Sequence, residues 1–232
     1  MHTENRETVV VGSVPRQLKG VISRLFEGGS VVARRDGKLH SLFPIGIPSR
    51  EGEALREWVK REDAASTIEV GLGYGISALF ICDGLLANGH ANARHVALDP
   101  NQHEGFSDVG LQVIDDAGAT GMLEFYAERS EIALPRFLSL GRSFDLAFID
   151  GNHRFECVFL DLMYLGHLVR HSGVIVLDDY QLQSVKKAVR FCVSNLGWAL
   201  QEEGIADERH HWAVLRTRAI PLERSFDHFV DF

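Results

Sequence analysis

The sequence predicts an α/β fold of the Rossmann-like, doubly wound type: a seven-stranded sheet in which five parallel crossovers are closed by an antiparallel strand pair. Three observations lead to this prediction. Short apolar runs alternate with helical patterns through the middle of the chain, the first run leads into a glycine-rich loop, and two further apolar runs follow Gly197. Regular alternation of strands and helices is typical of a parallel sheet with helices on both faces.

Five apolar runs have the length and composition of buried parallel strands. They occupy residues 67–70, 95–98, 122–126, 144–149 and 173–177. Helical patterns follow them with one apolar face toward the sheet, as in the stripe that runs from Val185 to Cys192 after the last strand. The helix expected near residues 130–140 contains Pro135.

The last part of the chain predicts the pair of strands that closes the sheet. Residues 198–201 and 211–216 are apolar runs joined by a polar stretch, so we expect them to pair antiparallel.

In the helix that follows the fourth strand, Phe155 and Phe159 are expected to face the sheet. Asp161 then falls on the opposite side, and we expect it to face solvent.

Residues 1–47 are expected to form an appendage, and residues 48–232 the α/β domain. Within the appendage, Asp36 and Gly37 separate two strand-like runs and predict a two-residue hairpin turn. Ser49 is expected to cap the first helix of the domain. The appendage would cover the site or contact a second subunit, so a homo-oligomer is one expectation.

Composition excludes several classes of function. The 232 residues are 45% apolar and 24% charged, and a net charge of −8 disfavours nucleic acid or an anionic membrane as the main partner. Three scattered cysteines indicate neither a zinc site nor a disulfide framework. No apolar run is long enough to span a bilayer. We therefore expect a cytoplasmic protein that acts on a small molecule.

The loop after the first strand carries the strongest motif. Gly71, Gly73 and Gly75 stand at alternate positions between a predicted strand and a predicted helix, where the backbone can turn sharply and approach a ligand. In a dinucleotide fingerprint the third glycine would fall at Ile76, so a nicotinamide enzyme is disfavoured. Asp99 ends the second strand, where an acid can either accept the hydroxyls of a ribose or cap the turn that follows.

Together these residues resemble the first two motifs of class I S-adenosylmethionine-dependent methyltransferases. The resemblance implies S-adenosylmethionine as the methyl donor, with Asp99 on its ribose and the loop 128–130 near its adenine. The residues that it implies for binding the donor are Glu69, Gly71, Gly73, Gly75, Ser77, Asp99 and Ser130.

Acids also end the fourth and fifth strands. Asp150 follows the fourth strand, and Asp178 and Asp179 follow the fifth. Because these strands are expected to be neighbours, the three carboxylates would lie close together and repel one another unless a cation or a proton relieves them. Mg²⁺ or another divalent cation, which prefers oxygen ligands, would do so.

The same segments resemble a narrower branch, the metal-dependent O-methyltransferases of small molecules such as antibiotic sugars and catechols. The resemblance implies that Asp150, Asp178 and Asp179 bind the metal. Relatives often carry an Asp at the position of Asn152, where it can act as a general base. Asn152 cannot, so His153 becomes the candidate base, acting together with Asp150.

Other functions remain open at this point. A metal-independent methyltransferase would use the acids to position a nitrogen or oxygen acceptor by hydrogen bonds. A non-catalytic module could bind S-adenosylmethionine through the same glycine loop. Neither the identity of the acceptor nor the need for a metal follows from the sequence.

Overall fold

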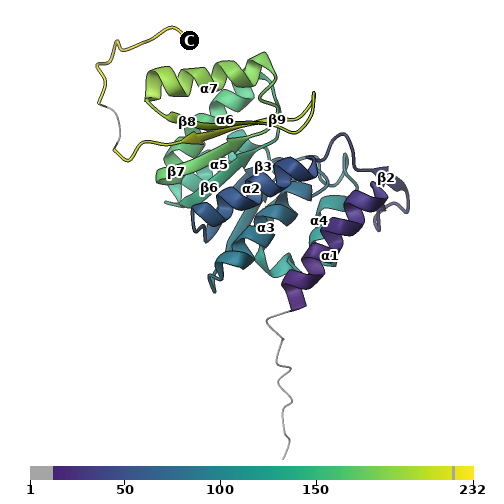
Figure 1. The fold of residues 1–232 in the computed structure, drawn as a ribbon. Helices are drawn as coiled ribbons and strands as arrows, with labels where there is room; N and C mark the ends of the chain where they lie inside the picture. The colour runs from purple at the N-terminus through teal and green to yellow at the C-terminus, as the bar shows by residue number, and fades with distance from the viewer. Residues whose placement is uncertain (1–12, 221–222) are drawn as a thin grey trace, which may run out of the picture.

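The computed structural model describes residues 13–220 and 223–232, so the first twelve residues of the expected appendage lie outside the described part. Seven strands form the main sheet, in the order β5-β4-β3-β6-β7-β9-β8 (Figure 1). They are β3 (Ser66–Val70), β4 (Arg94–Leu98), β5 (Leu123–Tyr126), β6 (Phe144–Ile149), β7 (Val169–Leu177), β8 (Ala199–Ile205) and β9 (His211–Arg216). The five strands from β3 to β7 pair parallel, and β9 pairs antiparallel with both β7 and β8, which confirms the predicted topology.

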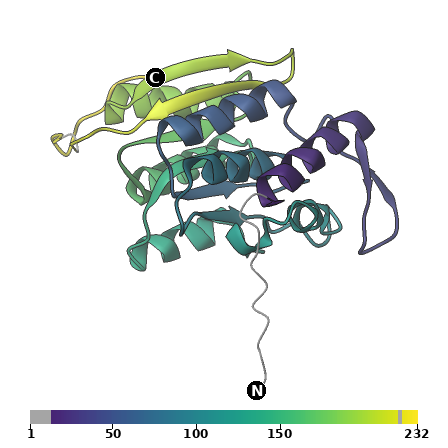
Figure 2. The same ribbon diagram turned by 60° about the horizontal axis from the view of Figure 1, so that its bottom comes forward.

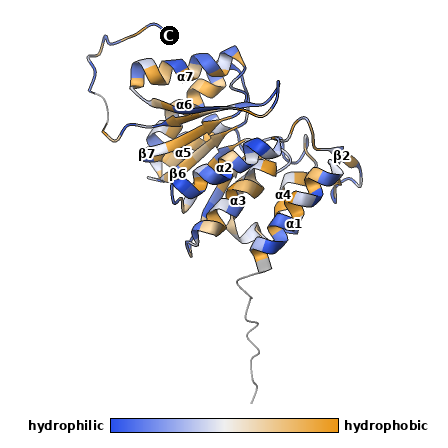
Figure 3. Cartoon of the chain, in the orientation of Figure 1, coloured by the Kyte–Doolittle hydropathy of each residue, from blue (hydrophilic) through white to orange (hydrophobic). Residues whose placement is uncertain are grey.

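Helices cover both faces of this sheet (Figures 1 and 2). They are α1 (Ser13–Gly28), α2 (Ser49–Arg61), α3 (Ile76–Asn88), α4 (Val109–Asp116), α5 (Ser130–Ser139), α6 (Phe155–Leu168) and α7 (Gln183–Leu196), with a short 3₁₀ turn at Thr120–Met122. One buried cluster joins the sheet to α1, α2, α3 and α4, and a second joins it to α5, α6 and α7. The hydropathy colours of Figure 3 agree, because β6 and β7 are mostly hydrophobic and α1 alternates between hydrophobic and hydrophilic positions. No described helix is both long and apolar enough to cross a membrane.

Two glycines bring α2 and α3 into close contact. A Cβ at Gly52 would overlap the ring of Phe80, and a Cβ at Gly84 would come within 2.8 Å of Val59. The helices therefore pack more closely than side chains at these positions would allow. The first turn of α2 begins with Ser49 as its first helical residue and Pro48 in the N-cap position, one residue earlier than expected for the cap.

Two strands differ from the expected lengths. β7 begins at Val169, and β8 continues to Ile205, where it pairs with His211. The polar residues of β8 lie on an edge strand, so backbone pairing with β9 extends further than apolar content suggested. The α5 helix spans the expected region and includes Pro135.

The N-terminal hairpin is real, but its turn is longer than two residues. β1 (Ser30–Val32) and β2 (Leu39–Ser41) pair antiparallel with Val32 opposite Leu39, which leaves six residues in the connection. The tip bends toward α4, where Arg34 forms ion pairs with Asp115 and Asp116. Contacts with α4 thus override the local turn preference of Asp36 and Gly37, and Arg34 and Arg35 are paired with neighbouring acids.

Candidate active site

A cavity of about 1190 Å³ opens at the carboxyl ends of the parallel strands. Its walls include the glycine loop after β3, the turns after β4 and β5, and the acids after β6 and β7. Parallel α/β sheets bind ligands at this edge, because the loops that leave the strands converge there. Residues that were predicted separately from five different segments therefore share one cavity.

The glycine loop requires glycine at two positions. Gly71 has a φ of 97°, and a Cβ there would overlap the carbonyl oxygen of Asp150. Gly75 has a φ of 78° and immediately precedes α3, and its Cβ would lie 2.8 Å from Val113. The loop can pass between the neighbouring segments only without side chains at these positions, and this leaves its backbone exposed to the cavity.

Asp99 lies against this loop. Its carboxylate accepts hydrogen bonds from the backbone N–H of Gly73 at 2.9 Å and from that of Asn101 at 2.8 Å. The side-chain amide of Gln102 bridges the same region, donating to the Gly73 carbonyl at 2.8 Å. Asp99 thus caps its own turn and also lines the cavity, so the two alternatives left by the sequence are compatible.

Glu69 does not line the cavity. It is fully buried beneath the loop, where it accepts a 2.8 Å hydrogen bond from the Ser77 hydroxyl and lies 3.1 Å from the ring nitrogen of His95. Ser77 itself faces the cavity. Glu69 is therefore placed to hold Ser77 and the start of α3, and direct contact with a ligand would have to come from Ser77.

On the β5 side, away from the acids that follow β6 and β7, the cavity is lined by residues 128–131, Cys157 and Asp161. Asp161 is only 2% exposed, so the expectation that it faces solvent is wrong. The buried stripe of α6 runs through Val158, Leu162 and Leu165, whereas Phe155 is 37% exposed, so the stripe lies nearer to Asp161 than expected. Burial raises the pKa of Asp161 to about 7, although the hydroxyl of Ser130 faces it and partly opposes the shift.

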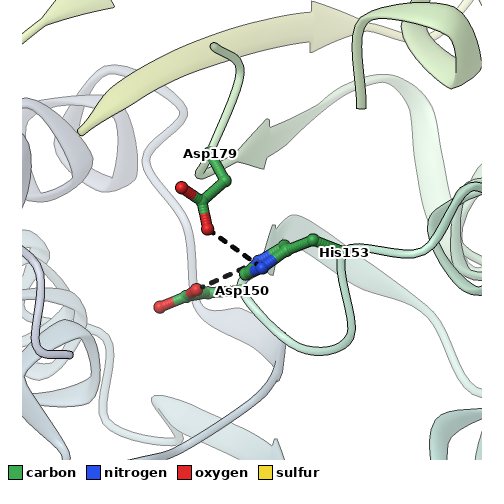
Figure 4. A group of neighbouring side chains, drawn as sticks. All are labelled: Asp150, His153 and Asp179. Carbon is green, nitrogen blue, oxygen red and sulfur yellow. Dashed lines mark ion pairs between the residues drawn. The ribbon is translucent and has the colours of Figure 1, made fainter. Parts of the chain in front are cut away.

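The strand-end acids meet His153 in the other half of the cavity (Figure 4). The Nδ1 atom of His153 lies 2.9 Å from Asp179, and its Nε2 atom lies 3.5 Å from Asp150. One possible ligand atom from each of these three residues falls within 4.8 Å of the other two. The predicted proximity of Asp150 and Asp179 is confirmed. His153, predicted as a base, joins them as an ion-pair partner.

Asp178 is turned toward a residue that sequence analysis missed. Its carboxylate accepts a 2.6 Å hydrogen bond from the Asp179 backbone N–H and faces Glu51, from the first turn of α2. Glu51 is 1% exposed, and neither carboxyl oxygen has a hydrogen-bond donor among the described residues. The sequence around Glu51 gave no signal of this role, because Glu51 looks like an ordinary acid in an amphipathic helix. Only the close packing of α2 on α3 brings it to the site.

The electrostatics of this cluster follow from burial and crowding. Burial and the neighbouring acids raise the pKa of Glu51 to about 11, and burial together with Asp178 raises that of Asp150 to about 8. Burial alone would lower the pKa of His153, but the carboxylates of Asp150 and Asp179 outweigh it and raise this pKa to about 10. In Asp179, the ion pair with His153 outweighs burial and lowers the pKa. The cluster therefore has more buried carboxyl groups than nearby positive charge, which suits a divalent cation with oxygen ligands.

The remaining wall is built by the appendage and the loop between β8 and β9. Residues 44–47 supply apolar surface, and residues 208–210 lie across from them. The Nε2 atom of His210 lies 3.2 Å from the carbonyl oxygen of Pro44, which joins the two segments. His210 lines the cavity because this contact folds the loop inward.

Known methyltransferases resemble this chain in sequence and in fold. Residues 68–180, from β3 before the glycine loop to the acid pair Asp178 and Asp179, match the family model described as a methyltransferase domain. This segment is therefore similar to a methyltransferase domain. The glycine loop and the acids that follow β6 and β7 belong to the matched segment, whereas Glu51 lies before it.

Two curated relatives from Arabidopsis thaliana resemble this segment and its flanks. A protein named "putative caffeoyl-CoA O-methyltransferase" is 29% identical over 142 residues, which cover 61% of this chain and 58% of the relative. Tapetum-specific methyltransferase 1 is 28% identical over 140 residues, or 60% of this chain and 57% of the relative. The matched part thus spans less than two thirds of either relative.

Solved structures share the fold of the chain at low identity. The O-methyltransferase TomG from Streptomyces achromogenes, solved with S-adenosylmethionine, superposes with a TM-score of 0.68 at 15% identity, covering 87% of this chain and 89% of that one. An O-methyltransferase from Bacillus cereus, solved with S-adenosylhomocysteine, gives a TM-score of 0.67 at 14% identity, covering 91% and 94%. These likenesses establish the architecture around the cavity.

Proposed function

We propose that this protein transfers the methyl group of S-adenosylmethionine to a hydroxyl group of a small molecule, assisted by a divalent cation. The observation that carries the proposal is that one cavity joins the glycine loop and Asp99 to the cluster of Asp150, His153 and Asp179. A methyl donor and an acceptor bound in these two halves would lie side by side, as direct transfer requires. The O-methyltransferases among the relatives and structural neighbours support this assignment.

In the donor half, Asp99 would accept hydrogen bonds from the ribose hydroxyls. The exposed backbone of Gly71 and Gly73 and the hydroxyl of Ser77 would contact the methionine part. Gly75 is buried and does not line the cavity, so it would shape the loop without touching the donor. Ser130, at the start of α5, would lie at the adenine. The protein supplies mainly alignment here, because the sulfonium is already an excellent leaving group.

In the acceptor half, Asp150, Asp178 and Asp179 would hold Mg²⁺ or another divalent cation. The unpartnered oxygens of Glu51 and the excess of buried carboxyl groups favour a cation in this place. When bound, the cation would lower the pKa of an acceptor hydroxyl and fix its direction. Vicinal hydroxyls, as in a catechol or a sugar, suit such a site.

His153 is proposed as the proton acceptor. Transfer forms a bond between the acceptor oxygen and the methyl carbon, breaks the bond from that carbon to sulfur, and leaves the hydroxyl proton to be removed. His153 lies between Asp150 and Asp179, where a neutral ring nitrogen could take this proton. Its pKa of about 10 among unneutralised acids means that it must be relieved of its proton first, and a nearby positive charge favours that.

One observation favours a second candidate, a metal-independent methyltransferase. The His153 ring already pairs with both Asp150 and Asp179, and this arrangement partly neutralises the acids without a metal. In that case the acids would position a nitrogen or oxygen acceptor by hydrogen bonds.

The experiment that separates the two candidates is methyl transfer from radiolabelled S-adenosylmethionine to a panel of catechols, sugars and amines. The assay would be run with EDTA, and again after Mg²⁺ is restored. Loss of transfer with EDTA and recovery with Mg²⁺ would support the metal-dependent proposal. Equal rates under both conditions would support the metal-independent one, and donor binding without transfer to any acceptor would point to a binding module.

A further inference from the structure

Asp161 is a buried carboxyl group that the proposed chemistry does not use. It is 2% exposed, yet it lines the cavity at the end away from the acid cluster. Within the described ranges 13–220 and 223–232 it forms no ion pair with Lys, Arg or His, and the Ser130 hydroxyl faces it. A buried carboxyl group without strong donors is costly, so its retention in a cavity wall points to a donor on the ligand.

The position of Asp161 relative to the other walls limits which part of a ligand it meets. Asp99 lies at the glycine loop, and Asp150 marks the end where methyl transfer would occur. A nucleoside with its ribose on Asp99 and its sulfur near Asp150 leaves only the base to occupy the remaining end. That end is lined by residues 128–131, Cys157 and Asp161.

The chemistry of Asp161 matches adenine. Asp161 offers only acceptor oxygens when ionised, and the exocyclic amino group of adenine offers two N–H donors. Hypoxanthine, in which a carbonyl oxygen replaces the amino group, would set that oxygen against the carboxylate.

We propose that Asp161 is a specificity-determining residue that recognises the adenine of the methyl donor by accepting a hydrogen bond from its exocyclic amino group. This inference rests on the proposed function, because it assumes that the cavity binds the nucleoside. It adds a residue from α6 to the donor site, beyond the loops that end the strands. A site built to accept a hydrogen bond rejects analogues that lack the donor, because the buried group is then left unpaired.

Calorimetric titration of two nucleosides, S-adenosylhomocysteine and S-inosylhomocysteine, tests the proposal. These compounds differ at the base, where a carbonyl oxygen replaces the amino group and the adjacent ring nitrogen gains a proton. We expect the unmodified protein to bind the adenosyl compound on the order of 100-fold more tightly. In Asp161→Leu this preference should fall to within a few-fold, whereas Glu156→Gln, an exposed change on the same helix, should retain it.

The ratio of the two affinities separates recognition from a structural role. A structural defect would weaken both compounds alike and leave the ratio unchanged, and that result would overturn the inference. Equal binding of both compounds by the unmodified protein would also overturn it. If neither compound binds the unmodified protein, the proposed donor site itself fails, together with this inference.

A second variant keeps the test usable if Asp161→Leu does not fold. Asp161→Asn retains the volume and adds an N–H₂ group that can donate to the carbonyl of the inosyl base. We expect it to bind S-inosylhomocysteine more tightly than the unmodified protein does. An unchanged affinity for that compound in a folded Asp161→Asn protein would contradict the inference.

Discussion

The backbone N–H of Gly73 donates a 2.9 Å hydrogen bond to the carboxylate of Asp99, 26 residues further along the chain. This bond joins the two motifs that first indicated a nucleoside site, because it fixes the acid at the end of β4 against the glycine loop at the end of the neighbouring strand β3. The Gln102 amide reinforces the junction from the turn after Asp99. The predictions below depend on this arrangement and on the acid cluster beside it.

Replacing Asp178 with Asn should separate chemistry from donor binding. The variant removes one negative charge from the proposed cation site but leaves the glycine loop and Asp99 unchanged. We expect methyl transfer to fall by on the order of 100-fold or more, because the cation would no longer be held in place. Affinity for S-adenosylhomocysteine, measured by calorimetry, should change by no more than a few-fold. Parallel loss of transfer and nucleoside binding would instead indicate a folding role for Asp178.

Gly75 and Gly89 allow a matched test of the crowding around the loop. Both have a left-handed backbone, with φ of 78° and 76°, but a Cβ at Gly75 would meet Val113 at 2.8 Å, whereas one at Gly89 meets nothing within 4 Å. We expect Gly89→Ala to cost about 1 kcal/mol of unfolding free energy, from backbone strain alone. Gly75→Ala should cost about 2 kcal/mol more because of the clash. Urea denaturation measures both values, and equal costs would contradict the packing described for the loop.

The metal-free protein should become less stable as the pH rises. Glu51 holds its proton to about pH 11 in the folded state, compared with about 4.5 for an ordinary glutamate, and His153 holds its proton to about pH 10 rather than 6.5. The folded state therefore binds more protons than the unfolded state between these values, and each extra proton lowers the unfolding free energy by up to about 1.4 kcal/mol per pH unit. Chemical denaturation in EDTA at pH 6 and pH 9 should show the loss.

Glu51→Gln identifies the source of that loss. The amide does not titrate, so the fall in stability between pH 6 and pH 9 should be smaller than in the unmodified protein. Glu53→Gln, an exposed change on the same helix, serves as the control and should leave the slope unchanged. Identical slopes in all three proteins would mean that Glu51 does not carry the excess proton.

Mg²⁺ should stabilise the protein more at high pH than at low pH. Binding requires ionised carboxylates, and burial raises the pKa of Asp150 and Asp178 above the ordinary value, so protons must leave before the cation binds. The rise in melting temperature on adding Mg²⁺ is expected to be larger at pH 9 than at pH 6. The absence of any Mg²⁺ effect at either pH would count against a cation at this site.

The sequence predicted the sheet well because its signals are local. Buried strands and the apolar stripe ending at Cys192 can be recognised from neighbouring residues, and the glycine spacing reports a backbone requirement at Gly71 and Gly75. Strand-end acids could also be placed near one another, because the carboxyl ends of neighbouring parallel strands meet at one edge. The proximity of Asp150 and Asp179 follows from this rule, whereas the position of His153 between them does not.

The errors arose where tertiary contacts outweigh local pattern. Glu51 reaches the site only because Gly52 allows α2 to pack against Phe80. Asp161 faces the cavity because the buried stripe of α6 is rotated away from Phe155, which is partly exposed. The hairpin turn at Asp36 is longer than expected because Arg34 pairs with acids on α4. Phe80 is far from Gly52 in the sequence, and the acids on α4 are far from Arg34, so local patterns could not reveal these contacts.

Calorimetric titration with S-adenosylhomocysteine, comparing the unmodified protein with Asp99→Ala, tests the central claim most directly. Two charge-assisted hydrogen bonds to the ribose would be lost in the variant, so its affinity should fall by on the order of 100-fold. Binding by the unmodified protein with this loss in the variant is the predicted result. No binding by the unmodified protein, or equal affinities in both proteins, would contradict the account.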